Sequence, residues 1–219
     1  MTVSDFVDQK LKVSGKVALI TFDDGYLDTL VTAAPALAER SLASTVYITS
    51  GFLKGRGEQL PGPPDPMMTW PQLNELEAFE IEIGAHSHSH RHMDTLSRAA
   101  INDELTRPKA MIEGQLGHAI RSFAYPHGYC GPRVRRLTKA AGYESAAGVR
   151  NLFSHTDDDN YNIARLTITN NTSAFDVEQW LDGSGSTIAA SKEALKTTGW
   201  RMYRRSKAIL TRTPGSDYT

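Results

Sequence analysis

The sequence predicts an α/β protein whose core is a parallel sheet, either open or closed into a barrel. Two observations predict this class. Short runs rich in β-branched residues alternate along the chain with stretches whose apolar residues recur at helical spacing, an order typical of βαβ units. The chain has 219 residues, of which 40% are hydrophobic, and this is enough for one sizeable core. We therefore expect a single domain over residues 1–219.

Composition narrows the class of protein. A formal net charge of −1 argues against an electrostatic nucleic-acid binder. The single cysteine, Cys130, excludes an intrachain disulfide and a multi-cysteine zinc site. No stretch reaches the ~18 apolar residues of a membrane helix, and the N-terminus shows no signal peptide. We expect a cytoplasmic or membrane-peripheral protein without an integral membrane segment; composition does not indicate its oligomeric state.

The first predicted strand is the apolar run 17–22, which reads as buried on both faces and ends at Asp23, Asp24 and Gly25. Residues 27–40 carry apolar side chains at helical spacing and predict an amphipathic helix. The β-branched run 44–49 follows as a second strand, so the pair should be parallel with a right-handed crossover.

Residues 54–68 hold three glycines and four prolines, which predicts a long loop of the kind that forms lids. Thr69 is expected to cap a short helix, with Trp70 in its first turn and packed in the core. Residues 80–84 predict the third strand. A helix over 97–117 should begin at a Ser97 cap and be interrupted or kinked at its proline.

The remaining elements continue the alternation. Strands are expected at 122–126, 144–148 and 164–169, and helices at 132–141, 175–181 and 191–205. The last helix is locally basic, with Arg201, Arg204, Arg205 and Lys207, followed by Arg212. We interpret it first as a solvated helix face, with contact to a membrane or an anionic partner as the alternative.

Three polar clusters follow predicted strands. They are Asp23–Asp24, the segment from His86 to His90, and the segment from Tyr125 to Gly128. The carboxyl ends of parallel strands share one face, where the site of such a fold belongs. The sequence therefore predicts that these clusters meet at one mouth.

A metal site can be built from these clusters. His86 and His90 are four residues apart, which on a helical turn puts both rings on one side, with His88 pointing away. One carboxylate of Asp23–Asp24 would complete a three-ligand set that leaves room for water, and the second would serve as general base. Spacing does not assign the two acids. A solvated Asp-Asp-Gly turn and a histidine-rich surface loop are the alternatives.

These motifs carry a family resemblance. Thr21-Phe-Asp-Asp-Gly25, His86-Ser-His-Ser-His90 and Phe123-Ala-Tyr-Pro-His-Gly128 resemble, in order and interval, the first three motifs of the polysaccharide deacetylases, the NodB-homology or carbohydrate esterase family 4-like proteins. The resemblance covers about residues 16–182 and leaves 183–219 as a helical, basic C-terminal extension. It implies a deformed (β/α) barrel of about seven parallel strands.

The resemblance also implies an activity and roles for residues. The activity is hydrolysis of the N-acetyl group of an amino sugar, in an oligo- or polysaccharide or a lipid-linked glycan, with one zinc-like divalent ion that cobalt or nickel can replace. Asp23 would be the base, and Asp24, His86 and His90 the metal ligands. Tyr125 and His127 would line the groove, with the His127 backbone N–H donating to the oxyanion.

The sequence departs from the family pattern at two places. Ala124 stands where many members carry an arginine that pairs with the base, and Arg165 is the replacement we choose, an ordinary surface arginine being the alternative. The late histidine that serves as general acid is missing, which leaves His155, His127 or Asp23 for that role. Hydrolysis of another C–N bond, in a formamide or a ring amide, and a non-catalytic carbohydrate-binding relic remain alternative functions.

Overall fold

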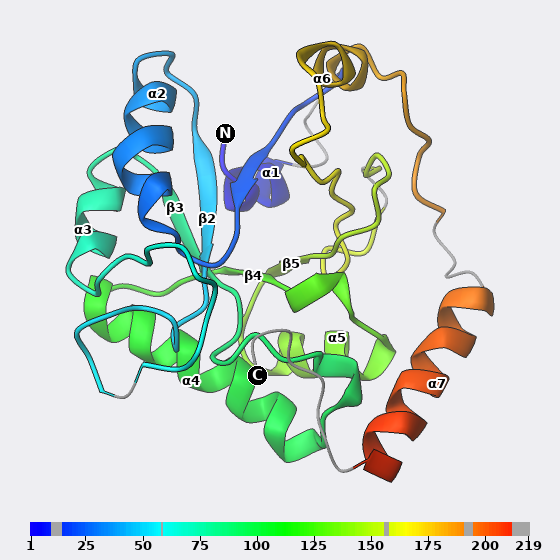
Figure 1. The fold of residues 1–219 in the computed structure, drawn as a ribbon. Helices are drawn as coiled ribbons and strands as arrows, with labels where there is room; N and C mark the ends of the chain where they lie inside the picture. The colour runs from blue at the N-terminus through cyan, green and yellow to red at the C-terminus, as the bar shows by residue number, and fades with distance from the viewer. Residues whose placement is uncertain (10–14, 58, 156–157, 191–194, 212–219) are drawn as a thin grey trace.

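The computed structural model describes residues 1–9, 15–57, 59–155, 158–190 and 195–211 (Figure 1). Its strands are β1 Ile20–Phe22, β2 Ser44–Ile48, β3 Glu82–Ala85, β4 Ser122–Ala124 and β5 Ser145–Ala147. The α-helices are α1 Val3–Gln9, α2 Ala34–Ala38, α3 Gln72–Glu77, α4 Arg98–Leu116, α5 Pro132–Ala140, α6 Ala174–Leu181 and α7 Leu195–Thr211. A π-helical turn, η1 Thr29–Ala33, leads into α2, and the 3₁₀ turns η2 Met93–Thr95 and η3 Pro126–Gly128 follow β3 and β4.

The sheet is parallel and its strands lie in chain order. The five strands of the described part run β1-β2-β3-β4-β5, with registers such as Phe22 opposite Val46 and Ile48 opposite Ala85. Helices α2, α3, α4 and α5 cover the outer side of the curved sheet (Figure 1). This half-barrel confirms the predicted deformed (β/α) barrel, although the described residues form five strands where about seven were expected. All strand carboxyl ends face one mouth.

The first strand is shorter and less buried than predicted. It begins at Ile20, and Val17 is 41% exposed, so the expectation of a strand buried on both faces from residue 17 is wrong. β1 is the edge strand of the sheet and, within the described residues, pairs with β2 alone, so part of its surface is left uncovered. The apolar residues of this run led us to expect too much burial, because an apolar run does not show whether a strand has a neighbouring strand on both sides.

No strand forms over residues 164–169. A single parallel bridge joins Ala147 to Ile163, after which the backbone turns to a different partner. The Asn151 backbone N–H donates to the carbonyl of Arg165, and the Asn151 side chain accepts from the Thr167 N–H. Ile168 is 70% exposed. The segment bonds to a loop rather than a sheet edge, so the predicted sixth strand is wrong.

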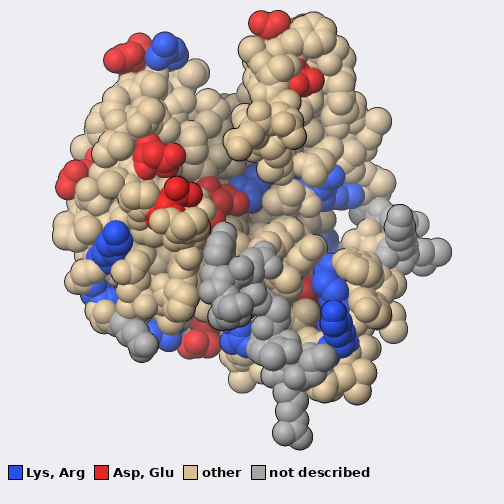
Figure 2. Space-filling view, viewed as in Figure 1, with Lys and Arg blue, Asp and Glu red and all other residues tan. Residues whose placement is uncertain are grey.

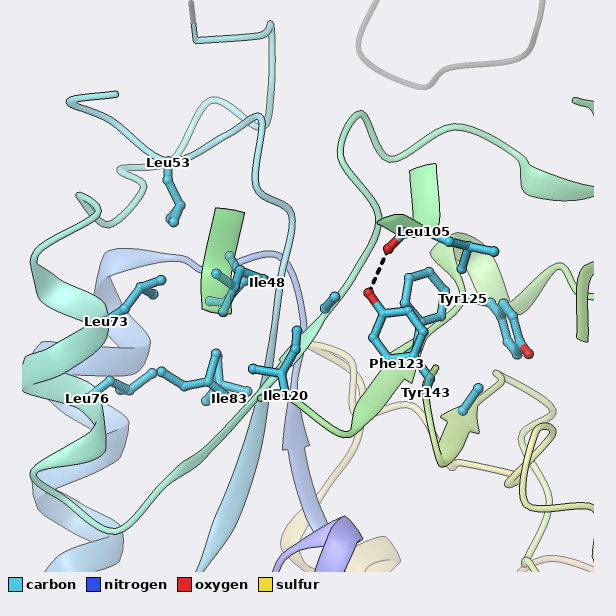
Figure 3. Packing of buried hydrophobic residues seen from close by; sticks show 14 of the residues in the cluster. Ile48, Leu53, Leu73, Leu76, Ile83, Leu105, Ile120, Phe123, Tyr125 and Tyr143 are labelled. Atoms are coloured by element: carbon cyan, nitrogen blue, oxygen red, sulfur yellow. Dashed lines mark hydrogen bonds between the residues drawn. The ribbon is translucent and has the colours of Figure 1, made fainter. Parts of the chain in front are cut away.

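The core lies between the sheet and its helices (Figure 3). Ile48 and Ile83 on neighbouring strands pack against Leu73 and Leu76 of α3. On the other side, Phe123 packs with Tyr143, whose hydroxyl donates to the Leu105 carbonyl of α4. Burying side chains of this size contributes about 1.5–3 kcal/mol each and fixes the sheet against its helices. The strand ends are thereby held as a rigid frame.

Two helix starts test the predicted caps. The Ser97 hydroxyl accepts from the Ala100 N–H, as expected. α4 then runs through Pro108 to Leu116, so the predicted interruption at the proline does not occur. Thr69 is not the cap of the next helix: α3 begins at Gln72, and the Thr69 hydroxyl donates to the Gln72 side chain. Trp70 is buried, as predicted. Residues 54–68 form no helix or strand where they are described.

The C-terminal helix is not simply solvated. The first residues of the predicted 191–205 helix lie outside the described part of the chain, and α7 continues to Thr211. Arg204 forms an ion pair with the buried Asp94 of η2 and lies 3.7 Å from the ring centroid of Tyr129. One basic side chain thus anchors α7 to the body. Among the described helices, α7 included, none is long and apolar enough to cross a membrane.

Candidate metal centre and active site

The two acids sit in a tight turn at the end of β1. Asp24 and Gly25 both have left-handed backbone, with φ of 72° and 95°. The Thr49 N–H donates to the Asp24 carbonyl, and the Met68 N–H donates to that of Gly25. A Cβ on Gly25 would lie 3.1 Å from the Ile48 side chain, so glycine suits both the backbone and the space. The turn fixes where both carboxylates point.

The histidine segment is a loop, not a helical turn. It follows β3, and Ser87 and His90 have left-handed backbone, with φ of 65° and 54°. The His90 N–H donates to the Ser87 hydroxyl at 3.0 Å. The prediction that a helix brings His86 and His90 together is therefore wrong in its local structure. The loop nevertheless turns both rings to the same side.

Asp24, His86 and His90 form one cluster. A carboxylate oxygen of Asp24 lies 3.7 Å from His86 Nε2 and 3.4 Å from His90 Nε2. The three ligand atoms all lie within 4.8 Å of one another, and both histidine side chains are buried. In the described part of the chain no other group of histidine, cysteine and acid side chains comes together in this way.

The protonation states suit a cation. His86 Nδ1 lies 2.8 Å from the Ala124 carbonyl, to which it can only donate, so Nε2 is the ring nitrogen left to bind a metal. Burial, with His86 beside it, lowers the pKa of His90 to about 2, which keeps that ring neutral. Burial raises the pKa of Asp24, and the neighbouring Asp23 adds to this. A divalent ion would relieve that cost, so these residues fit a metal.

Asp23 is held by Arg165. The guanidinium donates to both carboxylate oxygens, at 2.7 and 2.8 Å, and also to the Thr21 hydroxyl and the Gly148 carbonyl. Burial alone would raise the pKa of Asp23, but the charge of Arg165, helped by His86, lowers it to about 2. The carboxylate is ionised at neutral pH and its orientation is fixed by a bidentate pair.

Tyr125 does not reach the site. Its side chain is fully buried, packs against Phe123, and donates from its hydroxyl to the Tyr161 carbonyl (Figure 3). The prediction that this ring lines a substrate groove is therefore wrong. Burial and the hydroxyl's partner both make it a core residue. The aromatic character of a motif did not show on which face of the strand the ring lies.

The other histidines lie in different places. His88 points away, as expected, with its Nδ1 2.8 Å from the Ser50 hydroxyl. The His127 ring stacks edge-on against His90 at a centroid distance of 4.5 Å, and its backbone is left-handed, with φ of 57°. The His92 ring contacts His127 in turn at 4.4 Å. His155 is exposed on a loop, and its backbone N–H donates to the Asp158 carboxylate.

Sequence reasoning missed Thr49. Its hydroxyl lies 3.2 Å from Asp24 Oδ1 and 3.1 Å from the His86 carbonyl, so it contacts both halves of the cluster. Thr49 directly follows β2, and the rule that strand ends converge could have found it. In the space-filling view the molecule is hollowed between the parts that carry α2 and α6, and acidic and basic side chains meet at the bottom of the hollow (Figure 2).

Comparison with solved structures supports the fold. The Streptococcus pyogenes deacetylase PplD superposes with a TM-score of 0.69 at 19% identity, over 80% of this chain and 76% of that one. IcaB from Ammonifex degensii gives 0.65 at 21% identity, over 81% and 77%. A family 4 carbohydrate esterase from Streptomyces lividans gives 0.53 at 18% identity, over 94% and 95%. These similarities establish a shared deacetylase fold.

Sequence comparison gives the family. The Bacillus subtilis protein YxkH is 22% identical over 161 residues, which are 74% of this chain. The alignment spans 54% of YxkH, so the chain matches about half the length of that curated relative. The family model described as Polysaccharide deacetylase matches residues 10–146, more than half of the chain. The chain therefore belongs to the polysaccharide deacetylase family.

Proposed function

We propose that the protein is a metal-dependent carbohydrate N-deacetylase, which hydrolyses the N-acetyl group of an amino sugar in an oligo- or polysaccharide or a lipid-linked glycan. One observation carries the proposal: an ionised carboxylate, Asp23, is clamped by Arg165 beside a cluster of three metal-ligand side chains. Asp23 Oδ2 lies 3.6 Å from His86 Nε2. A base and a metal site within one cluster are what metal-assisted amide hydrolysis requires.

Asp24, His86 and His90 would hold one divalent ion. Two imidazoles and one carboxylate are a ligand set of catalytic zinc, and cobalt or nickel accept the same set. When bound, such an ion polarises a carbonyl and lowers the pKa of water. Thr49 and the Ala124 carbonyl would keep the Asp24 and His86 ligand atoms aimed inward.

Asp23 is the proposed general base. Its ionised carboxylate would take a proton from the attacking water, and Arg165 would hold its two oxygens in place as it does so. No histidine follows His155 in this sequence to take the place of the family's late histidine, and we propose that Asp23 also returns the proton to the leaving amine. The His127 backbone N–H would donate to the oxygen that gains charge in the tetrahedral intermediate.

The site residues limit the type of reaction more strongly than they limit which acyl group is removed or which molecule carries it. Structures of PplD and of the Streptomyces lividans esterase are described as complexes with acetate, which supports an acetyl product. A formamide or a ring amide would use the same residues, because they act on the carbonyl alone. A non-catalytic relic has no use for a clamped carboxylate that is not itself a ligand, so the Asp23–Arg165 pair supports the enzyme.

The test is acetate release from N-acetylglucosamine oligomers by zinc-loaded protein. We expect Asp23→Asn to keep its metal and lose about 10²–10⁴-fold in rate, because it lacks the base. Asp24→Asn should lose the metal. Asp28→Asn is the matched control, since Asp28 is exposed and lies four residues after Asp24 in the chain. Parallel assays with N-formyl and cyclic amide substrates identify the alternative hydrolases. Metal-loaded wild type that releases no acyl group from any amino sugar would overturn the deacetylase proposal.

A further inference from the structure

The loop between the two histidine ligands is held from two directions. One side is the chain that follows β2. There the Ser50 N–H donates to the Ser87 carbonyl at 3.2 Å, and the Gly51 N–H donates to the His88 carbonyl at 2.9 Å. A Cβ on Gly51 would lie 2.4 Å from that carbonyl oxygen, so the two backbones meet at a distance only glycine permits. This contact fixes the loop's carbonyls.

The loop's amides are held from the opposite direction by one carboxylate. Glu104 of α4 is 4% exposed. Its Oε2 accepts from the backbone N–H groups of His88 and Ser89, at 2.8 and 2.9 Å. Its Oε1 accepts from the Ser89 hydroxyl. All three donors belong to the residues between the ligands, and Glu104 itself contacts neither His86 nor His90 in these bonds.

We infer that Glu104 is the positioning residue of the metal centre: it sets the separation of His86 and His90 by clamping the loop between them. The inference rests on the proposed metal site. Ser87 and His90 hold left-handed backbone, which is sparsely populated for residues other than glycine and persists only where the surroundings enforce it. Glu104 enforces it through the three bonds that its carboxyl group accepts, from a helix anchored in the core.

The chemistry of the clamp requires a carboxylate. Three donors converge on two oxygens that have only lone pairs to offer. A glutamine at this position would keep one oxygen but turn an NH₂ group toward N–H or O–H donors, so at least one bond is replaced by a donor–donor contact. Removal of a group that orients metal ligands typically lowers metal affinity about 10–100-fold. We expect Glu104→Gln to lie in this range.

A matched control exists elsewhere in the sheet. Glu82, at the start of β3, is also a carboxylate that accepts from a backbone N–H and from hydroxyls, those of Ser4, Thr45 and Ser122. It lies at the opposite end of the strand from the histidine loop. Glu82→Gln should lower the stability of the metal-free protein without lowering its affinity for metal, which separates a fold effect from a positioning effect.

The experiment measures zinc affinity by competition with a chromophoric chelator, and urea unfolding of the metal-free proteins. Expected are a 10–100-fold weaker affinity in Glu104→Gln, unchanged affinity in Glu82→Gln and no tight binding in Asp24→Asn. Affinity in Glu104→Gln within twofold of wild type overturns the inference and leaves the proposed function intact. A wild type that binds no zinc overturns the metal site instead.

If Glu104→Gln does not fold, a second variant, Ser89→Ala, tests the same inference. Ser89→Ala removes only the hydroxyl donor and leaves both backbone bonds to Glu104. We expect a loss of a few-fold in zinc affinity, together with faster hydrogen exchange of the His88 and Ser89 amides. Wild-type affinity and exchange in this variant would overturn the inference. The visible spectrum of the Co²⁺-loaded protein should change in the same variants, since it reports ligand geometry.

Discussion

Arg165→Met removes the cation that faces Asp23, and its cost can be estimated from the structure. The ordinary pKa of 3.8 falls to about 2 in the fold, a difference worth about 2.5 kcal/mol at pH 7. Removing one partner of a buried pair typically costs about 3–5 kcal/mol, because the other charge is left behind. Asp23 is 29% exposed, which favours the lower values. We expect a loss of about 3 kcal/mol.

The pH dependence of this loss identifies its cause. A carboxylate whose pKa is lowered by folding stabilises the protein above its unfolded pKa near 4, and this stabilisation disappears as the pH falls through about 2. Without Arg165, burial raises the pKa of Asp23 in the folded variant, so the difference between wild type and Arg165→Met should be largest at neutral pH, begin to shrink at that raised pKa and continue to shrink down to about pH 2. Urea unfolding of metal-free protein over this range measures it.

Arg121→Met is the matched control. Arg121 also donates to two acids, Asp8 and Glu144, but its side chain is 35% exposed and both acids are 53% exposed. Water competes for such pairs, so we expect a much smaller loss of stability. The reasoning is refuted if both variants lose the same amount, or if the loss in Arg165→Met does not depend on pH below 4.

Three further outcomes are expected. Gly84→Ala should lower the free energy of unfolding in urea by about 1–3 kcal/mol, because the new Cβ would lie 2.6 Å from the Tyr47 ring. Gly114→Ala, whose Cβ would have nothing within 4 Å, should raise it by about 0.5–1 kcal/mol. Equal effects of the two variants would contradict the packing argument. Arg204→Met should release α7 and speed its cleavage in limited proteolysis, while Leu210→Ala, at a side chain 83% exposed, should not; unchanged cleavage would show that the Asp94 pair does not anchor the helix. Metal-free His90→Gln should lose less stability than wild type as the pH falls from 6.5 to about 4. In this range His90 of the unfolded wild type gains a proton, whereas His90 of the folded wild type, with a pKa of about 2, stays neutral. Parallel profiles of unfolding free energy against pH would contradict this.

The sequence alone was sufficient for much of the fold and for the meeting of the acid and histidine side chains at one end of the sheet. Alternating strands and helices predicted the parallel sheet, and the convergence of strand ends predicted that the Asp23–Asp24 pair would meet the histidine segment, while the family resemblance selected Asp24, His86 and His90. Arg165 was chosen from the sequence to replace a missing arginine, and it lies against Asp23. These predictions succeeded because they depend on topology, which short motifs at strand ends reveal.

The predictions that failed depend on neighbours that a sequence does not name. Val17 is apolar and β-branched, as buried strand residues are, but it lies before β1, which begins only at Ile20 and is an edge strand. Tyr125 belongs to a motif near the site, yet its ring turns into the core. The helical spacing of His86 and His90 placed the ligands together for the wrong reason, since left-handed residues in a loop do so. Glu104 and Thr49 carry no motif at all.

The position of the Asp23–Arg165 pair has a mechanical consequence. β1 and β5 are the two edges of the sheet, and within the described residues no backbone ladder joins them. Arg165 lies two residues after Ile163, which bridges to β5, and its guanidinium reaches across to Thr21 of β1 and to Asp23 directly after β1. The ion pair thus connects the two edges of the half-barrel that no backbone hydrogen bonds join in the described residues. Loss of this ion pair would release the proposed base while the strand pairings within the sheet stay intact.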